Sequence, residues 1–272
     1  MPYECNLCGE KFCSDHRLPE KHSCPMLDRG GTDANVVVEI ENQRSDENGG
    51  LSDKIPSTPS FDGLIDGKVN RVFGLTILVV YVLQLLTIAI AGNEVHNAIF
   101  VLQPNNITHV WTWFTSIFAH SPFMLFHIIG NGFILIFFGG LVERLIGSRD
   151  YAVLFISAGV VAGLGQAILG LALGDPSVGI LGASGALLAV LGVLTTYKPD
   201  LTVYLYFFIP APLWLITGGY AVLSIVGVLA GGGVGGIAHG AHLIGLLIGL
   251  LYGYRTKDEH SVRDSTRIGG QV

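Results

Sequence analysis

The sequence predicts an all-α membrane protein, a bundle of six transmembrane helices preceded by a small metal-binding module on a flexible linker. Half of the 272 residues are hydrophobic and only 13% are charged, about half the charged fraction of an average soluble domain. The hydrophobic residues form runs of about 20, the length that an α-helix needs to cross a bilayer. All four cysteines lie near the N-terminus, and such clustering is typical of a metal site rather than of a disulfide framework.

The first 70 residues are polar and divide into two parts. Residues 1–27 contain three closely spaced pairs of ligand-type residues, Cys5-x-x-Cys8, Cys13-x-x-His16 and His22-x-Cys24. This spacing indicates zinc, and so short a segment needs the metal in order to fold. Residues 28–70 are rich in Asp, Gly, Ser and Asn, which predicts a flexible polar linker.

Residues 71–256 contain six apolar runs, each expected to form a membrane-spanning helix. They lie at residues 72–91, 127–146, 151–173, 181–196, 204–229 and 235–254, and the fifth is interrupted by Pro210 and Pro212. The segment 92–126 is amphipathic, holds Trp111 and Trp113 and lacks Lys and Arg. Because amphipathic aromatic residues favour the membrane interface, we expect this segment to lie there. Residues 257–272 form a charged tail that we expect in the cytoplasm.

All Lys and Arg residues fall on one side of this six-span arrangement. From the N-terminal region through the successive loops to the tail they number eight, none, two, none, one, none and four. Basic residues flank the cytoplasmic side of transmembrane helices, so both termini are predicted to be cytoplasmic in an integral protein of the plasma membrane. The predicted surroundings are the lipid bilayer, and the net charge of −6 gives no indication of a nucleic-acid partner.

This topology brings four polar residues from three spans to one depth in the membrane. Counted from the outer ends of their spans, Ser184 lies three residues down, His242 seven, and His127 and Asn131 two and six. At 1.5 Å per residue, these positions are about 3–11 Å below the outer boundary. Polar side chains inside a membrane usually face the protein interior or a water-filled cavity. The sequence therefore predicts one cavity that opens to the outside.

A serine hydroxyl becomes an effective nucleophile when a base lies within hydrogen-bonding distance. His242 is the predicted base for Ser184, and His239, one helical turn earlier, is the rival. No Asp or Glu is expected at this depth, so the sequence predicts a dyad whose histidine is oriented by packing. His127 and Asn131 share a helix face and could donate hydrogen bonds to a developing oxyanion, beside the backbone N–H of Ser184.

Glycines on the fourth and sixth predicted spans allow these two helices to approach closely. Gly182 and Gly185 flank the serine, and Gly245 and Gly249 follow the histidine with small-xxx-small spacing, which lets helices pack tightly in lipid. Such a contact would place the two reacting side chains together. Without a catalytic role, the same residues would be a packing patch whose serine bonds its own helix backbone.

Four motifs cover the predicted membrane region: Gly182-Ala183-Ser184-Gly185, Ala241-His242-Leu243-Ile244-Gly245 with Gly249, His127-Ile128-Ile129-Gly130-Asn131, and Gly140-Leu141-Val142-Glu143-Arg144. By these motifs, residues 71–256 resemble the rhomboid family of intramembrane serine proteases. The resemblance implies a six-helix rhomboid bundle with Ser184 as nucleophile, His242 as base, and oxyanion support from His127 and Asn131. It also implies catalysis without a cofactor and substrates that are single-span membrane proteins with helix-weakening residues near the cut.

Two positions depart from the family pattern. Trp-Arg is common where the helical segment of the first loop begins, and this chain has Trp111-Thr112, which lowers the expectation of a polar network in that loop. Many members have an aromatic residue one turn after the serine that stacks on the histidine. Leu188 occupies that position here, so we expect His242 to be held less firmly.

The Cys/His spacing of residues 1–27 resembles the last six ligands of the AN-one type zinc finger, including the nearby Arg17 and Glu20. By that resemblance, one structural zinc site is completed by Cys5, Cys8, His22 and Cys24, and an orphan pair that could form a partial second site is left at Cys13 and His16. The predicted topology places the finger in the reducing cytoplasm, where thiols persist. We expect it to dock a cytoplasmic protein partner. The combination of this finger with a rhomboid region resembles archaeal proteins.

The predicted function is an intramembrane serine endopeptidase that cleaves single-span membrane proteins through a Ser184–His242 dyad. Two other functions fit parts of the sequence. A non-enzymatic rhomboid-like protein would hold membrane clients for degradation, but such proteins usually lack the serine or the histidine. A small transporter or channel would use His127 and His242 on a proton path and would show pH-dependent flux in liposomes.

Overall fold

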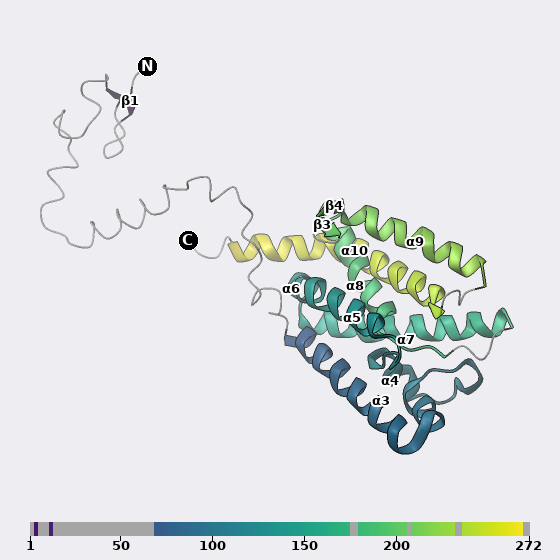
Figure 1. Ribbon diagram of the computed structural model, residues 1–272. Coiled ribbons are helices and arrows are strands. Elements are labelled where there is room, and N and C mark those ends of the chain that lie inside the picture. The colour runs from purple at the N-terminus through teal and green to yellow at the C-terminus, as the bar shows by residue number, and fades with distance from the viewer. Residues whose placement is uncertain are drawn as a thin grey trace, which may run out of the picture. The chain divides into compact units, whose positions relative to one another are not determined.

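The computed structural model describes residues 68–174, 179–205, 208–231 and 236–268, together with two short strands near the N-terminus (Figure 1). The chain divides into two units, Met1–Thr58 and Pro59–Val272. In the first unit, β1 (Tyr3–Glu4) pairs antiparallel with β2 (Lys11–Phe12). Residues 28–67 of the predicted linker and the predicted zinc ligands, Cys5, Cys8, Cys13, His16, His22 and Cys24, lie outside the described residues. Residues 68–70, which were also predicted to be linker, instead form the first turn of α3 (Lys68–Phe100).

The second unit is mostly helical, and each of the six predicted spans contains a helix. The helices are α3 (Lys68–Phe100), α5 (Leu125–Ile134) continued by η4 (Leu135–Gly139) and α6 (Gly140–Ile146), α7 (Ser148–Ala172), α8 (Ser184–Tyr197), α9 (Leu213–Leu229) and α10 (His239–Ile268). Among the residues that the structure describes, three stretches are long and apolar enough to cross a membrane: Lys68–Phe100, Leu125–Ile146 and Ser148–Ala172. The chain is therefore an integral membrane protein. That it crosses the membrane six times stays a prediction.

Three of the six predicted spans have clearly different boundaries in the structure. The first was expected to end at residue 91, but α3 continues to Phe100, with a non-helical backbone conformation at Gly92. Residues 204–212 were expected to be helical, but β3 (Thr202–Leu205) and β4 (Ile209–Pro212) form an antiparallel hairpin, and α9 begins only after it. The two prolines explain this difference, because proline lacks the N–H that an interior helical turn needs. At the other end of the chain, α10 runs on to Ile268, beyond the predicted limit at residue 254.

The helix α8 is the centre of the bundle. Its residues from 185 to 194 are all buried, and a helix that is apolar on every side belongs inside a bundle. It packs against α7, α9 and α10, whereas α3 and α9 lie on opposite sides of the bundle (Figure 1). Many apolar side chains of α3 are exposed, among them Leu75 and Ile90, as expected for a surface that faces lipid.

Glu143 ties the start of α3 to the end of the second span. Its carboxylate accepts hydrogen bonds from the backbone N–H groups of Val69 and Asn70 and from the hydroxyl of Ser148. These N–H groups belong to the first turn of α3 and have no acceptor within the helix. They also lie at the positive end of the helix dipole. The side chain of Asn70 also donates to the carbonyl of Leu135, at the start of the π-helical turn η4.

The segment between α3 and α5 contains η3 (Pro104–Asn106) and α4 (Thr112–Phe118). Both tryptophans that predicted an interfacial position donate hydrogen bonds to backbone carbonyls, Trp111 to Ala98 and Trp113 to Ile107. Thr112, the second residue of the Trp111-Thr112 pair, is buried and donates a hydrogen bond to the carbonyl of His109. This segment therefore has its own local hydrogen-bond network.

Candidate active site

Ser184 and His242 meet where α8 and α10 begin. Ser184 is the first residue of α8, and His242 is the fourth residue of α10. The serine Oγ lies 2.7 Å from the histidine Nε2, which is a short hydrogen bond. His242 is buried, with 7% of its surface exposed. This is the arrangement in which an imidazole can take a proton from a hydroxyl that attacks a substrate.

Close backbone contact between α8 and α10 makes this hydrogen bond possible. A methyl group on Gly245 would collide with the carbonyl oxygen of Gly185, and one on Gly249 would collide with that of Ala189. From the other helix, a methyl group on Gly192 would lie 2.7 Å from the carbonyl oxygen of Leu246. The predicted role of Gly245 and Gly249 in helix packing is thus confirmed, since only glycine allows so close an approach.

Tyr220 of α9 completes the surroundings of the imidazole, and the sequence analysis missed it. Its hydroxyl lies 2.8 Å from Nδ1 of His242, and the two ring centroids are 5.4 Å apart. A hydrogen bond with a tyrosine, besides the packing that we expected, therefore contributes to the orientation of His242. The signal in the sequence was weak: a tyrosine in the middle of an otherwise apolar run, preceded by Gly218 and Gly219.

His239, the rival base, occupies a different place. It is the first residue of α10, and its ring packs so closely on Gly227 of α9 that a methyl group there would overlap it. Its ring centroid is 6.4 Å from that of His242, and its buried Nδ1 has no hydrogen-bond partner among the described residues. The geometry favours His242 as the partner of Ser184.

His127 and Asn131 converge on Gly182, two residues before the serine. A methyl group built on Gly182 would lie 2.6 Å from Nε2 of His127 and 3.8 Å from Nδ2 of Asn131. Gly182 also has a φ of 122°, a backbone conformation that favours glycine. Both donors therefore lie beside the N-terminal end of α8, where the first backbone N–H groups have no acceptor within the helix.

The segment between α3 and α5 fixes the position of the residues that precede Ser184. Leu102 and Ile180 exchange two backbone hydrogen bonds of 3.0 and 2.8 Å. The N–H of Gly182 then donates to the carbonyl of Ser116 in α4, at 2.8 Å. These three bonds hold the residues that precede α8 at a fixed position relative to α4, and so they fix where Ser184 lies.

His120 lies behind His127 and is completely buried. Its backbone N–H donates to Oε1 of Gln84, and its carbonyl accepts from Nε2 of the same side chain, at 2.9 and 3.1 Å. Burial, and secondly the neighbouring His127, lowers the pKa of His120 to about 4. The ring is therefore neutral at physiological pH, which indicates a structural role for it.

The helix α8 is short for a membrane span. Its 14 residues make it about 21 Å long, less than the ~30 Å hydrocarbon core. The depth of Ser184 below the outer surface stays a prediction from the charge distribution.

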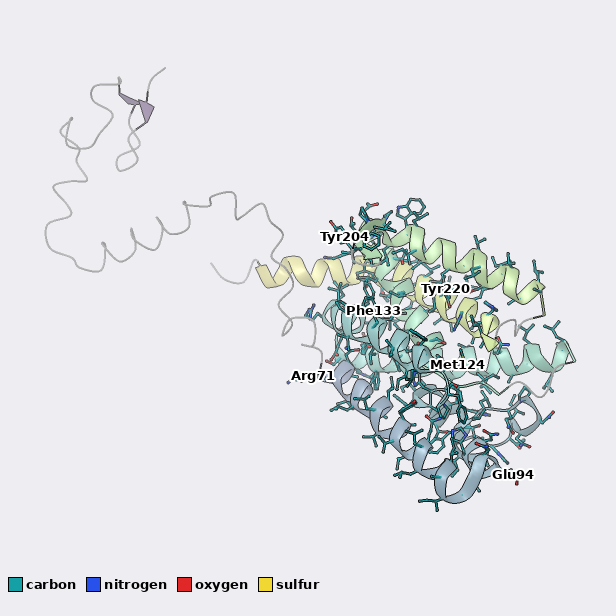
Figure 2. All side chains as sticks on the ribbon, viewed as in Figure 1. Arg71, Glu94, Met124, Phe133, Tyr204 and Tyr220 are labelled. Carbon is teal, nitrogen blue, oxygen red and sulfur yellow. The ribbon has the colours of Figure 1, made fainter. Side chains whose placement is uncertain are left out.

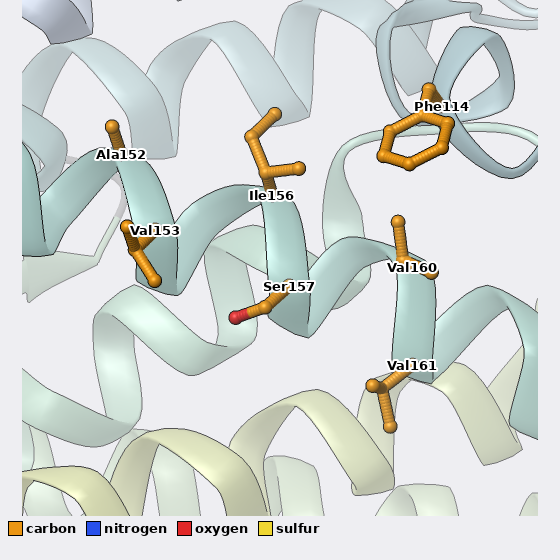
Figure 3. Close-up of a pocket in the computed structure, with 7 residues that line it drawn as sticks. All are labelled: Phe114, Ala152, Val153, Ile156, Ser157, Val160 and Val161. Atoms are coloured by element: carbon orange, nitrogen blue, oxygen red, sulfur yellow. The ribbon is translucent and has the colours of Figure 1, made fainter.

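The pocket shown in Figure 3 is a separate feature. It is lined by Phe114 of α4 and by six residues of α7, Ala152, Val153, Ile156, Ser157, Val160 and Val161. Phe114, Val153 and Val161 are about half exposed, as expected for an apolar surface that faces lipid acyl chains. None of the predicted site residues lines it, and no cluster of metal ligands occurs in the part of the chain that the structure describes.

Two family models match the chain. Residues 107–258 match the Rhomboid domain, and residues 1–29 match the AN1-like zinc finger. The first match covers more than half of the chain and includes Ser184, His242, His127 and Asn131. The second covers all six predicted metal ligands.

Curated relatives match the same membrane region. The presenilin-associated rhomboid-like protein, mitochondrial, of Mus musculus is 32% identical over 142 residues, which are 50% of this chain and 36% of the relative. The Homo sapiens protein of the same name is also 32% identical over 142 residues. Rhomboid protease GlpG of Yersinia pestis (strain Pestoides F) is 30% identical over 147 residues, 53% of this chain and 48% of that protein. The chain thus spans between a third and a half of the length of these relatives.

Proposed function

The chain belongs to the rhomboid family and carries an AN1-like zinc finger, and from this premise we propose that it is an intramembrane serine endopeptidase. The single observation that carries the proposal is the 2.7 Å hydrogen bond between Ser184 Oγ and His242 Nε2. A hydroxyl and an imidazole at that distance, buried in a membrane-spanning bundle, have the arrangement of a nucleophile and its base.

The reaction is an acyl transfer in two steps. In the first, Ser184 Oγ attacks the scissile carbonyl carbon while His242 Nε2 takes the hydroxyl proton; the C–N bond then breaks and the proton passes to the leaving amine. In the second, water attacks the acyl-enzyme, gives a proton to Nε2, and the ester bond to Ser184 breaks as that proton returns to Oγ. Acid–base catalysis of this kind contributes about 10²–10⁴-fold in rate.

We propose that His127 and Asn131 stabilise the oxyanion formed in both steps. Their nitrogens approach Gly182, and the backbone N–H of Ser184 points from the start of α8 without an intrahelical acceptor. Donors aimed at a developing negative charge contribute about 10²–10³-fold each. Asn131 Nδ2 donates one N–H to the carbonyl of His127 at 3.0 Å, and we propose that its second N–H donates to the oxyanion.

The substrates we propose are single-span membrane proteins. A peptide bond inside a regular helix is shielded by its own hydrogen bonds, so a segment with helix-weakening residues reaches Ser184 in an extended form at lower cost. The site begins below the outer surface, and both termini of the enzyme are cytoplasmic in this proposal because the basic residues lie on that side. The plasma membrane is the proposed location.

The proposed cofactor is a structural zinc ion in the N-terminal finger. Thiolate and imidazole ligands at this spacing match the tetrahedral preference of zinc, and Cys5, Cys8, His22 and Cys24 form the proposed set. The finger would dock a cytoplasmic protein, and deletion of residues 1–27 should then change the set of proteins that co-purify with the enzyme. An unchanged set would argue against this docking role.

Cleavage in proteoliposomes tests the proposed function. The purified full chain is reconstituted with a single-span substrate that carries Gly and Pro near its outer end, and product is followed by mass spectrometry. We expect cleavage by the wild type and none by Ser184→Ala or His242→Ala, with unchanged melting of Ser184→Ala. Substrate that binds the wild type but is never cut would instead indicate a non-enzymatic client-binding protein.

A further inference from the structure

We propose that Tyr220 is a positioning residue for the reaction: its hydroxyl selects the tautomer of His242 that leaves Nε2 free to take the proton of Ser184. The proposal rests on the proposed function. It follows from one contact, the 2.8 Å approach of the tyrosine oxygen to Nδ1, on the side of the ring opposite to the serine.

A neutral imidazole carries one proton, on either Nδ1 or Nε2. To act as a base towards Ser184, His242 must hold its proton on Nδ1, and that buried N–H then needs an acceptor. The lone pairs of the Tyr220 hydroxyl supply it. Once Nε2 has taken the serine proton, the same Nδ1–H bond remains and becomes charge-assisted, which stabilises the imidazolium that forms during the reaction.

Among the described residues, the titratable groups that face this imidazole are His239 and His127, besides Tyr220. None of them is a carboxylate. A carboxylate at Nδ1 only accepts, and so it enforces the productive tautomer strictly. A tyrosine hydroxyl can also donate, so it enforces that tautomer less strictly and stabilises the imidazolium less. The effect of removing it should therefore be smaller than that of removing a triad acid.

Contacts of α9 hold Tyr220 in place from both directions along the helix. One turn before it, Thr217 is buried and receives a hydrogen bond of 3.2 Å from Thr195 of α8. Two turns after it, Gly227 packs directly on the ring of His239. Thr217, Tyr220 and Gly227 follow each other at spacings of three and seven residues, so they share the face of α9 that meets α8 and α10. Figure 2 labels Tyr220 on this helix.

The test compares Tyr220→Phe with Tyr204→Phe, the same chemical change on an exposed tyrosine of β3 (labelled in Figure 2). The full-length variants are purified in detergent and reacted with a fluorophosphonate, and kcat and KM are measured with a reconstituted single-span substrate. The nitrogen chemical shifts of 15N-labelled His242 report its tautomer directly. All rates are measured below the melting temperature of every variant, so that a loss of stability does not count as a loss of activity.

We expect Tyr220→Phe to lower the labelling rate and kcat about 10- to 100-fold with KM within about twofold, and to shift the His242 nitrogen signals towards the Nε2-protonated tautomer. Tyr204→Phe should match the wild type in every measurement. Unchanged kcat and nitrogen signals in Tyr220→Phe would overturn the inference while leaving the proposed function intact. A wild type that neither reacts with the probe nor cleaves substrate would refute the proposed function itself.

Discussion

Ser184 Oγ and His242 Nε2 are 2.7 Å apart although 58 residues separate them in the chain. The contact depends on the glycines that let the backbones of α8 and α10 touch. It also depends on the backbone hydrogen bonds that fix the residues before α8. Substitutions at these glycines should therefore displace Ser184 or His242 without changing either side chain. Their effects can be measured separately from those of substitutions in the dyad.

Gly182→Ala should impair the site through two effects, strain and collision. The added methyl group would sit 2.6 Å from His127 Nε2, and the φ of 122° is unfavourable for alanine, which costs about 1–2 kcal/mol. We expect labelling by a fluorophosphonate to fall at least tenfold. Gly147→Ala is the matched control, since Gly147 has a φ of 89° with open space around it. Equal labelling of the two variants would show that the contact with His127 is unimportant.

Gly249→Ala should destabilise the contact between α8 and α10. Its methyl group would overlap the carbonyl oxygen of Ala189, and overpacking of a tight interface costs about 1–3 kcal/mol. Thermal unfolding in detergent should therefore show a lower midpoint than that of the wild type. Gly218→Ala, in a helix with no atom near the added methyl group, should be neutral or slightly stabilising. If Gly249→Ala melts like Gly218→Ala, the two helices are not as close as described.

Acid should weaken the fold through His120. Burial lowers the pKa of its ring from 6.5 to about 4, so between these values the unfolded chain binds a proton that the folded chain does not. The free energy of unfolding therefore keeps its full value above pH 6.5. It decreases by about 3 kcal/mol in all as the pH falls towards 4.

The free energy of unfolding, measured in detergent from pH 7 to pH 4.5, tests this dependence. It should decline less in His120→Gln than in the wild type, whereas His109→Gln, at a partly exposed histidine of the same segment, should retain the wild-type slope. The same slope in His120→Gln as in the wild type would contradict the assignment of the effect to this ring.

Zinc removal should separate the finger from catalysis. We expect about one zinc per chain, the capacity of one complete tetrahedral set, and loss of that zinc in Cys5→Ser. Chelation should leave fluorophosphonate labelling of Ser184 unchanged, because no step of the proposed reaction uses a metal. Labelling that falls with the zinc content and recovers on its return would show that the two parts are coupled.

Much of the fold could be predicted because the apolar runs are long and the motifs lie at their ends. The starts of α5, α8 and α10 carry His127, Ser184 and His242, and a count of residues from each start was enough to place them at one depth. The spacing of the glycines also predicted that α8 and α10 are in contact. These signals depend on composition and on local spacing, which a sequence displays directly.

The parts that could not be predicted depend on how a helix is rotated about its own axis. The sequence shows Tyr220 inside an apolar run, but packing against neighbouring helices decides which way it points, and this rotation brings its hydroxyl to His242. The hairpin formed by Thr202–Leu205 and Ile209–Pro212 was not predicted because of its composition. Its residues are apolar enough to extend the fifth run, and only the prolines indicated that the helix begins later.

Mapping the residue that a fluorophosphonate modifies tests most directly whether Ser184 is the nucleophile. The purified full-length protein is labelled in detergent, digested, and sequenced by tandem mass spectrometry, with Tyr204→Phe and Ser184→Ala treated in parallel. We expect a single phosphonyl adduct on Ser184 in the wild type and in Tyr204→Phe, and none in Ser184→Ala. An adduct on another residue, or equal labelling of Ser184→Ala, would contradict the assignment of this serine as the nucleophile.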